Sequence, residues 1–144
     1  MTPQDRARKC ADLMWAKDRA SQSLGMRIDA IGPGTATLSM PIRDDMLNGH
    51  GTCHGGMIFT LADSAFAFAC NSYNAVTVAH SNQITYIAPG PAGDTLTATA
   101  TETARQGRSG TYDVVVRTQD GQQIALFRGL SRTVRGQHFD EDDT

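Results

Sequence analysis

One ten-residue stretch gathers side chains that could carry out chemistry. Residues 47–56 read Leu-Asn-Gly-His-Gly-Thr-Cys-His-Gly-Gly, with two imidazoles, a thiol and four glycines. Imidazole and thiolate are good metal ligands, and a thiol activated by an imidazole is a common nucleophile. A glycine-rich segment can instead leave backbone N–H groups free to bind an anion. The candidate chemistries are therefore a metal site, a cysteine nucleophile and an anion-binding loop.

The metal and cysteine interpretations have the weaker support. His50, Cys53 and His54 have no second ligand pair, whereas a zinc site needs four fixed ligands or three plus water. We therefore expect no metal. Cys53 and His54 are neighbours in sequence, which does not by itself bring the imidazole to the sulfur. A phosphate-binding P-loop is excluded because no Lys-Ser or Lys-Thr pair follows the glycines.

The anion-binding interpretation gains support from the segment that follows. Residues 57–70 are almost entirely apolar and long enough for a helix that begins near Gly55 and Gly56. The first N–H groups of a helix have no partner within it, and the helix dipole favours negative charge there. Glycine also lets a substrate approach the backbone closely. Together these properties are those of an oxyanion hole.

Asp63 is the only acidic residue within this apolar segment. A carboxylate among residues such as Phe59 and Phe66 is costly unless it is paired, solvated or used in chemistry. It lies eight positions after Gly55, which is about 12 Å along a helix. One chain cannot readily bring both groups to one carbonyl, whereas a second copy packed antiparallel could. The spacing therefore favours a dimeric site.

Patterns elsewhere predict the elements that position this helix. The N-terminal segment up to about residue 21 begins with Thr-Pro-Gln-Asp, a typical helix start, and carries apolar residues at rough helical spacing. Alternating apolar and polar residues predict six strands, the first two and the last two joined as hairpins. These strands cover residues 25–31, 35–42, 76–87, 94–103, 111–118 and 123–133.

These elements predict an α+β fold. A helix that is apolar almost all round must be covered on most sides, and a single curled antiparallel sheet wrapped around it does so. We expect one domain over residues 1–136, with an N-terminal helix. The acidic residues 137–144 are expected to form a solvated, disordered tail.

Composition narrows the classes of partner and compartment. The 144 residues carry a net charge of −2, which argues against nucleic acid as a partner of the whole molecule. No apolar run reaches bilayer length and the N-terminus lacks the layout of a signal peptide, so we expect no membrane partner. The three cysteines show no disulfide spacing, which is typical of a cytoplasmic protein.

The motifs resemble those of the hotdog-fold acyl-CoA thioesterases, specifically the phenylacetate-degradation (PaaI-type) group. The resemblance rests on Asn-Gly-His at residues 48–50, His-Gly-Gly at 54–56 and Leu-Ala-Asp-Ser-Ala-Phe at 61–66. It continues through residues 89–100 and 125–129. It thus covers nearly the whole chain after the first helix.

This resemblance implies a hotdog fold and a homotetramer built as a dimer of dimers, with active sites at the dimer interface. It implies hydrolysis of phenylacetyl-CoA and its ring-hydroxylated relatives to free acid and coenzyme A. Medium aliphatic acyl chains are the alternative substrates. No cofactor is expected, because coenzyme A is part of the substrate.

By position, the resemblance makes Asp63 the catalytic carboxylate, either a general base on water or a nucleophile. Gly55 would donate its backbone N–H to the thioester carbonyl. Asn48 and His54 would hold the attacking water or orient the substrate. Related enzymes often place a Ser or Thr near the acid from the following strand, and three residues are candidates: Thr77, His80 and Ser81.

Coenzyme A also needs a surface for its phosphates. Residues 105–111, Arg-Gln-Gly-Arg-Ser-Gly-Thr, resemble the family's region that contacts pantetheine and nucleotide, and they are expected to connect two strands. An ordinary solvated turn is the competing interpretation for each residue. The predicted substrate and coenzyme A contacts are Gly56, Arg105, Gly107, Arg108 and Ser109.

Two other functions remain as alternatives. A hydratase or dehydratase of the same fold pairs an acid with a histidine, and Asp45 and His50 offer a faint match. The Gly-Asp-x-Asn-Pro-x-His string typical of hydratases is absent. A non-catalytic acyl-CoA-binding protein is the other alternative, although the intact set of Asn48, Gly55 and Asp63 argues against it.

Overall fold

The structure, a computed structural model, describes residues 1–141. It contains helices α1 (Pro3–Lys17), α2 (Arg19–Ser23) and α3 (Gly55–Cys70), and a 3-10 turn at Asp44–Met46. The six strands are β1 (Arg27–Gly32), β2 (Thr35–Pro41), β3 (Thr77–Tyr86), β4 (Thr95–Gln106), β5 (Ser109–Thr118) and β6 (Gln123–Thr133).

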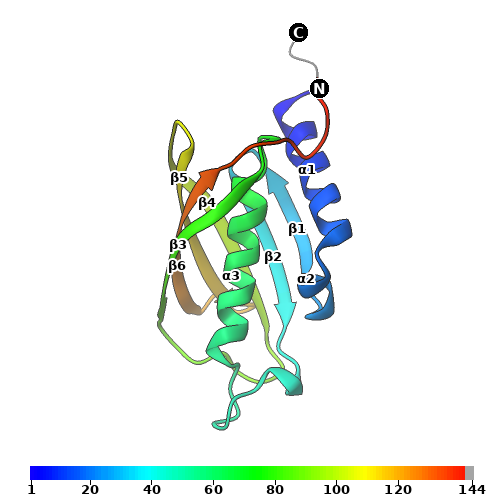
Figure 1. The fold of residues 1–144 in the computed structure, drawn as a ribbon. Helices are drawn as coiled ribbons and strands as arrows, with labels where there is room; N and C mark the ends of the chain where they lie inside the picture. The colour runs from blue at the N-terminus through cyan, green and yellow to red at the C-terminus, as the bar shows by residue number, and fades with distance from the viewer. Residues whose placement is uncertain (142–144) are drawn as a thin grey trace.

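The strands form one antiparallel sheet in the order β1-β2-β4-β5-β6-β3. The sheet curls around α3, which packs mainly against β2, β4 and β5, while α1 lies along β1 (Figure 1). This arrangement confirms the predicted α+β fold with one central helix and an N-terminal helix. The edge of β3 away from β6 has no strand beside it among the described residues.

The central helix lies close to the sheet because its buried side chains alternate small and large. Ala62, Ala65 and Ala69 are completely buried and let the helix backbone approach the strands. Phe66 then fills the space over β6, where a side chain on Gly129 would place its Cβ 2.7 Å from the Phe66 ring. The glycine is required by this close approach.

Two boundaries differ from the sequence prediction. The Thr2 cap is present, but α1 ends at Lys17 because Asp18 turns to cap a separate short helix, accepting a hydrogen bond from the Ser21 N–H. The predicted connection at residues 105–111 is much shorter. Strands β4 and β5 continue into it and leave only Gly107 and Arg108 as the turn. Gly107 adopts φ +59, which favours glycine at this position.

The first part of the predicted tail is folded onto the domain. Glu141 pairs with Arg6 at 2.6 Å, and the side-chain oxygen of Asn74 accepts from the N–H groups of His138 and Phe139. Residues 137–141 are therefore ordered by contacts that the acidic composition did not indicate. The rest of the predicted tail, residues 142–144, lies outside the described residues.

No helix in the described part of the chain is both long enough and apolar enough to cross a membrane.

Candidate active site

His54 builds the N-terminal end of α3. It is the residue that caps the helix, and its Nδ1 accepts a hydrogen bond from the Gly56 N–H at 2.9 Å. Because Nδ1 is the acceptor, the neutral ring carries its proton on Nε2. The His54 carbonyl accepts from Met57 and Ile58 and closes the first turn. The Gly56 N–H is thus already bonded within the chain.

The Gly55 N–H, by contrast, has no acceptor within residues 1–141. Its carbonyl accepts a hydrogen bond from the Tyr86 hydroxyl at 2.8 Å. A Cβ at Gly55 would lie 3.1 Å from the Tyr86 ring, so the ring packs directly against this glycine. The first residue of α3 therefore presents a free donor while Tyr86 holds its backbone in place.

Asn48 organises the loop before the helix. Its Oδ1 accepts from the N–H groups of His50 and Thr52, at 2.9 and 3.2 Å. Its Nδ2 donates to the Thr52 hydroxyl at 3.1 Å. These bonds give Asn48 a clear role in shaping the loop, and one Nδ2 hydrogen remains for another acceptor.

A cavity of about 330 Å³ brings Asn48 and Gly55 together. Apolar and aromatic side chains provide most of its other walls, as is usual for a small-molecule site. The lining residues are Asn48, Thr52, Cys53, Gly55, Ile58, Tyr86, Ile87, Ala88 and Pro89.

Asp63 is half-buried on α3 and receives a hydrogen bond from Asn82 Nδ2 to its Oδ1 at 3.0 Å. Burial raises the pKa of the Asp63 carboxyl, and the hydrogen bond from Asn82 offsets part of that rise. Asn82 is the only side chain within residues 1–141 that donates to this carboxylate. A carboxylate with a raised pKa is a stronger base than an exposed one.

Asn82 was not among the residues predicted to lie beside the acid. Thr77 bonds instead to Thr133 and to the Ala75 carbonyl, and His80 falls at a break in the β3–β6 register. Ser81 is exposed. A usable signal was present in the alternation: counting back two residues from the inward Ile84 gives Asn82.

The other amide atom of Asn82 is also informative. Its Oδ1 is buried, yet no donor within residues 1–141 bonds to it. Buried polar atoms almost always have a partner, so an unpaired one requires an explanation. The surroundings of Asp63 are therefore incomplete in the single chain.

The single chain does not bring the two halves of the predicted site together. Gly55 and Asp63 lie on the same continuous helix, so their separation stays at about 12 Å along its axis. Asp63 does not line the cavity that contains Gly55.

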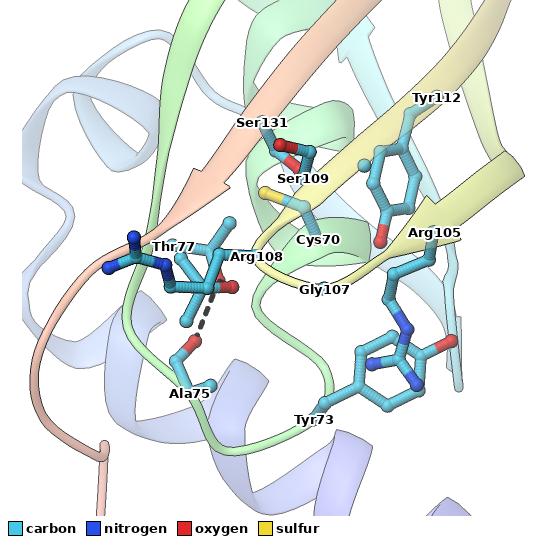
Figure 2. A pocket seen from close by; sticks show the side chains of 12 residues that line it. Cys70, Tyr73, Ala75, Thr77, Arg105, Gly107, Arg108, Ser109, Tyr112 and Ser131 are labelled. Carbon is cyan, nitrogen blue, oxygen red and sulfur yellow. Dashed lines mark hydrogen bonds between the residues drawn. The ribbon is translucent and has the colours of Figure 1, made fainter.

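The predicted coenzyme A contacts are divided in the same way. Arg105, Gly107, Arg108 and Ser109 line a small cavity of about 20 Å³, beside the C-terminal end of α3 (Figure 2). Gly56 lies at the other end of this helix, whose sixteen residues span about 24 Å. Four of the five residues are thus neighbours, and Gly56 is not.

The competing chemistries find little support in the geometry. No three His, Cys, Asp or Glu side chains of residues 1–141 are placed to hold a metal ion. Cys53 is buried, and burial raises the pKa of its thiol. The thiol bonds to the His54 carbonyl oxygen at 3.7 Å, and no hydrogen bond joins it to the imidazole within residues 1–141. The hydratase alternative pairs Asp45 with His50, but Asp45 forms an ion pair with Arg43 at 3.0 Å.

The sequence is similar to a known family and to known proteins. The sequence pattern of the Thioesterase superfamily matches residues 50–125. The acyl-coenzyme A thioesterase PaaI of Escherichia coli K12 is 43% identical over 126 residues, which are 88% of this chain and 90% of that protein.

Solved structures agree with this match. The E. coli PaaI protein from the phenylacetic acid degradation operon superposes with a TM-score of 0.93 at 40% identity, covering 94% of this chain and 99% of that chain. A Streptococcus mutans protein bound to acetyl CoA gives a TM-score of 0.75 at 25% identity, covering 78% of this chain and 90% of that chain.

Proposed function

The chain belongs to the thioesterase superfamily and is an acyl-CoA thioesterase, and we propose that its substrates are phenylacetyl-CoA and ring-hydroxylated phenylacetyl-CoA thioesters. The observation that carries this substrate class is the 43% identity, over most of both chains, to the E. coli thioesterase PaaI. That protein is encoded in the phenylacetic acid degradation operon. The cavity beside Gly55 supports it, because about 330 Å³ with Ile58 and Tyr86 in its walls suits an aryl group.

In the proposed mechanism, the Gly55 N–H donates to the thioester oxygen as negative charge develops there. One preorganised donor of this kind lowers the activation free energy by about 2.7–4 kcal/mol. Asp63 either takes a proton from the water that attacks the carbonyl carbon, or attacks that carbon itself, with loss of the thiolate, to form an anhydride that water then hydrolyses. The leaving group is a thiolate, which is stable enough to depart with little help from an acid.

His54 and Asn48 support the donor in this mechanism. His54 occupies the Gly56 N–H, which leaves the Gly55 N–H as the free donor at the start of the helix. Asn48 has one Nδ2 hydrogen to offer to the substrate or to water, on the wall of the same cavity. Coenzyme A is part of the substrate, and no cofactor is required by these steps.

A second copy of the chain is part of the proposal. We place Gly55 of one subunit opposite Asp63 of its neighbour, because the two groups are too far apart within one helix. The open edge of β3 carries the exposed side chains of Val78 and Tyr86 and is available for pairing with the same strand of a second copy. Two such dimers would form the tetramer. A cytoplasmic location is proposed from the three free cysteines.

The first experiment measures thiol release from phenylacetyl-CoA, its ring-hydroxylated analogues and a series of saturated acyl-CoAs. We expect kcat/KM to be highest for the aryl substrates and to fall by more than about 10³-fold in Asp63→Asn. Higher turnover of aliphatic chains would refute the aryl substrate class. Binding of all substrates without thiol release would instead support a non-catalytic acyl-CoA-binding protein.

A second experiment tests the shared site. Asp63→Asn and Gly55→Pro chains are each expected to be almost inactive, but a mixed dimer keeps one site with both groups intact. Random mixing and reassembly should therefore restore about a quarter of the wild-type activity. No recovery, despite mixed dimers detected by mass spectrometry, would show that each site is built from one chain.

A further inference from the structure

Two arginines lie near the turn of the β4–β5 hairpin, Arg105 and Arg108, and only one of them is held in place. The Arg105 guanidinium carbon lies 3.5 Å from the centroid of the Tyr73 ring, and its Nε is 3.8 Å from the Glu102 carboxylate. The Arg108 guanidinium makes no hydrogen bond or ion pair within residues 1–141. Figure 2 shows Arg105 over the tyrosine ring and Arg108 on the other side of Gly107.

An irregularity in β4 makes this arrangement possible. In a regular strand Glu102 and Arg105, three residues apart, would point to opposite faces of the sheet. The register between β4 and β5 shifts between Glu102 and Ala104, which inserts Thr103 as an extra residue. The bulge brings Glu102 and Arg105 to the same face, and bulges commonly re-aim side chains in this way next to functional sites.

Glu102 and Tyr73 are themselves fixed by their surroundings. One carboxylate oxygen of Glu102 accepts from the hydroxyls of Tyr73 and Tyr112, at 3.0 and 2.9 Å. The turn between β1 and β2 closes over this pair: a Cβ on Gly34 would lie 2.8 Å from the Tyr73 hydroxyl and 3.1 Å from the Glu102 Cβ. The surface beneath Arg105 is therefore rigid before any ligand binds.

The contacts of Arg105 leave its donors available. A separation of 3.8 Å from Glu102 is too long for a hydrogen bond, and stacking on Tyr73 uses the face of the guanidinium and not its N–H groups. The side chain remains 47% exposed. The planar fork of N–H groups can therefore bind a second partner, and phosphate matches its geometry.

We propose that Tyr73 and Glu102 are positioning residues, which hold Arg105 as a preorganised cation for a phosphate group of coenzyme A. The inference rests on the proposed function, because the phosphates are the anionic part of an acyl-CoA substrate. An arginine ordered in advance loses less side-chain entropy when it binds, so the stack on Tyr73 strengthens binding without contacting the ligand.

The test compares phenylacetyl-CoA with S-phenylacetyl-pantetheine, which has the same thioester but no phosphate. In Tyr73→Leu, which removes the ring under Arg105, KM for phenylacetyl-CoA should rise about five- to tenfold with kcat unchanged. Tyr73→Phe keeps the ring and should change KM by less than about twofold. Neither substitution should alter KM for the pantetheine thioester.

A double-mutant cycle makes the assignment specific. Arg105→Ala should raise KM for phenylacetyl-CoA at least as much as Tyr73→Leu, and adding Tyr73→Leu to it should have no further effect. Arg117→Ala removes the same charge from an exposed position of β5 and serves as the control. Equal losses with both thioesters, or additive effects of Tyr73→Leu and Arg105→Ala, would overturn the inference.

Calorimetric binding of coenzyme A alone separates this inference from the proposed function. The expected result is a five- to tenfold weaker Kd in Tyr73→Leu, about 1–1.4 kcal/mol at 25 °C, whether or not the enzyme releases thiol from the aryl substrates. Failure of thiol release would refute the catalytic proposal and leave this one standing. Equal affinity of wild type and Tyr73→Leu for coenzyme A would refute the positioning role alone.

Discussion

The first part of α3, residues 55–63 (the open end), leaves polar groups without partners, whereas polar groups at its C-terminal end (the paired end) are closely paired. The Gly55 N–H has no acceptor within residues 1–141, the buried Oδ1 of Asn82 beside Asp63 has no donor there, and a cavity of about 330 Å³ adjoins Gly55. At the other end, Asn71 bonds both the N–H and the carbonyl of Thr77. The Ser72 hydroxyl donates to Ala69 and accepts from Gly34.

The difference indicates that paired polar groups at one end stabilise the fold, whereas unpaired groups at the other end are available to bind a substrate. Unpaired buried groups cost free energy, and proteins keep them mainly where a substrate, water or partner completes them. The cavity at the paired end holds about 20 Å³, the space of one water molecule. Substitution of Gly55 at the open end should therefore change activity more than stability, and substitution of Asn71 at the paired end the reverse.

Removing the free donor at the open end is expected to have a large effect on activity and little effect on stability. Gly55→Pro deletes the N–H, and the backbone accepts proline there because it is the first position of the helix and His54 is extended (φ −60, ψ 134). We expect kcat to fall by about 10²–10³-fold, with the melting temperature nearly unchanged. The measurement is steady-state kinetics with phenylacetyl-CoA beside thermal unfolding.

Gly55→Ala is the matched control for that change. It keeps the N–H and adds only a Cβ against Tyr86, whose ring can shift because half of it is exposed. Its kcat should fall by about tenfold or less, as only substrate approach is affected. Equal losses in the alanine and proline variants would show that space at Gly55, and not its N–H, limits the reaction.

The paired end should respond with stability instead. Asn71→Ala leaves the buried N–H and carbonyl of Thr77 without partners and removes the contact with the His138 ring. The free energy of unfolding should fall by about 2–4 kcal/mol, measured by chemical denaturation at a fixed protein concentration. The activity of the folded fraction should remain close to that of the wild type.

Gln119→Ala is a suitable comparison, since this exposed amide makes one hydrogen bond to the Thr95 N–H. It should change stability by less than about 0.5 kcal/mol. If Asn71→Ala were equally mild, the paired end would not be the stabilising part of the helix.

The sequence predicted the open end more completely than the paired end. The glycines, His54 and the lone acid lie within seventeen residues, so local spacing was sufficient to place them on one loop and one helix. Asn82 and Tyr86 reach that helix from β3, and their positions depend on strand register and on the bulge near His80. Alternation indicates the face of β3 on which a residue lies, but the helix residue that it meets follows from tertiary packing.

The same reason explains what was missed around the hairpin. Arg105 and Arg108 were recognised as basic residues of one turn, but their different surroundings arise from Tyr73 and from the bulge at Thr103. The ordering of residues 137–141 likewise depends on Asn74, a residue far away in sequence that adopts φ +61. Acidic composition alone predicts solvation, and it cannot indicate such a specific partner.

A smaller effect at the open end is a change in pH dependence. If Asp63 acts as a carboxylate, activity falls as pH drops through its pKa, which burial places above the ordinary range. Asn82→Leu removes the hydrogen bond that lowers this pKa. The acidic limb of the kcat/KM profile should therefore move to higher pH. An unchanged limb would show that Asn82 does not tune the acid.

The smallest expected effect is a gain in stability when the acid itself is replaced. Because the pKa of Asp63 is raised in the folded state, the folded protein binds this proton more tightly than the unfolded chain does. The stability that this proton contributes is present below the unfolded pKa and is lost as pH rises through the folded pKa. The ionised carboxylate is therefore a net cost to stability once the pH exceeds the folded pKa.

Asp63→Asn removes that charge, and its new amide can donate to the unpaired Oδ1 of Asn82. The melting temperature at pH 7 should rise by about 2–4 °C for each 1 kcal/mol gained, while activity is lost. The gain should shrink as pH falls and wild-type Asp63 takes up its proton. Thermal unfolding of both proteins across pH tests this directly. A stability difference that stayed constant with pH would show that the charge of Asp63 does not destabilise the folded protein.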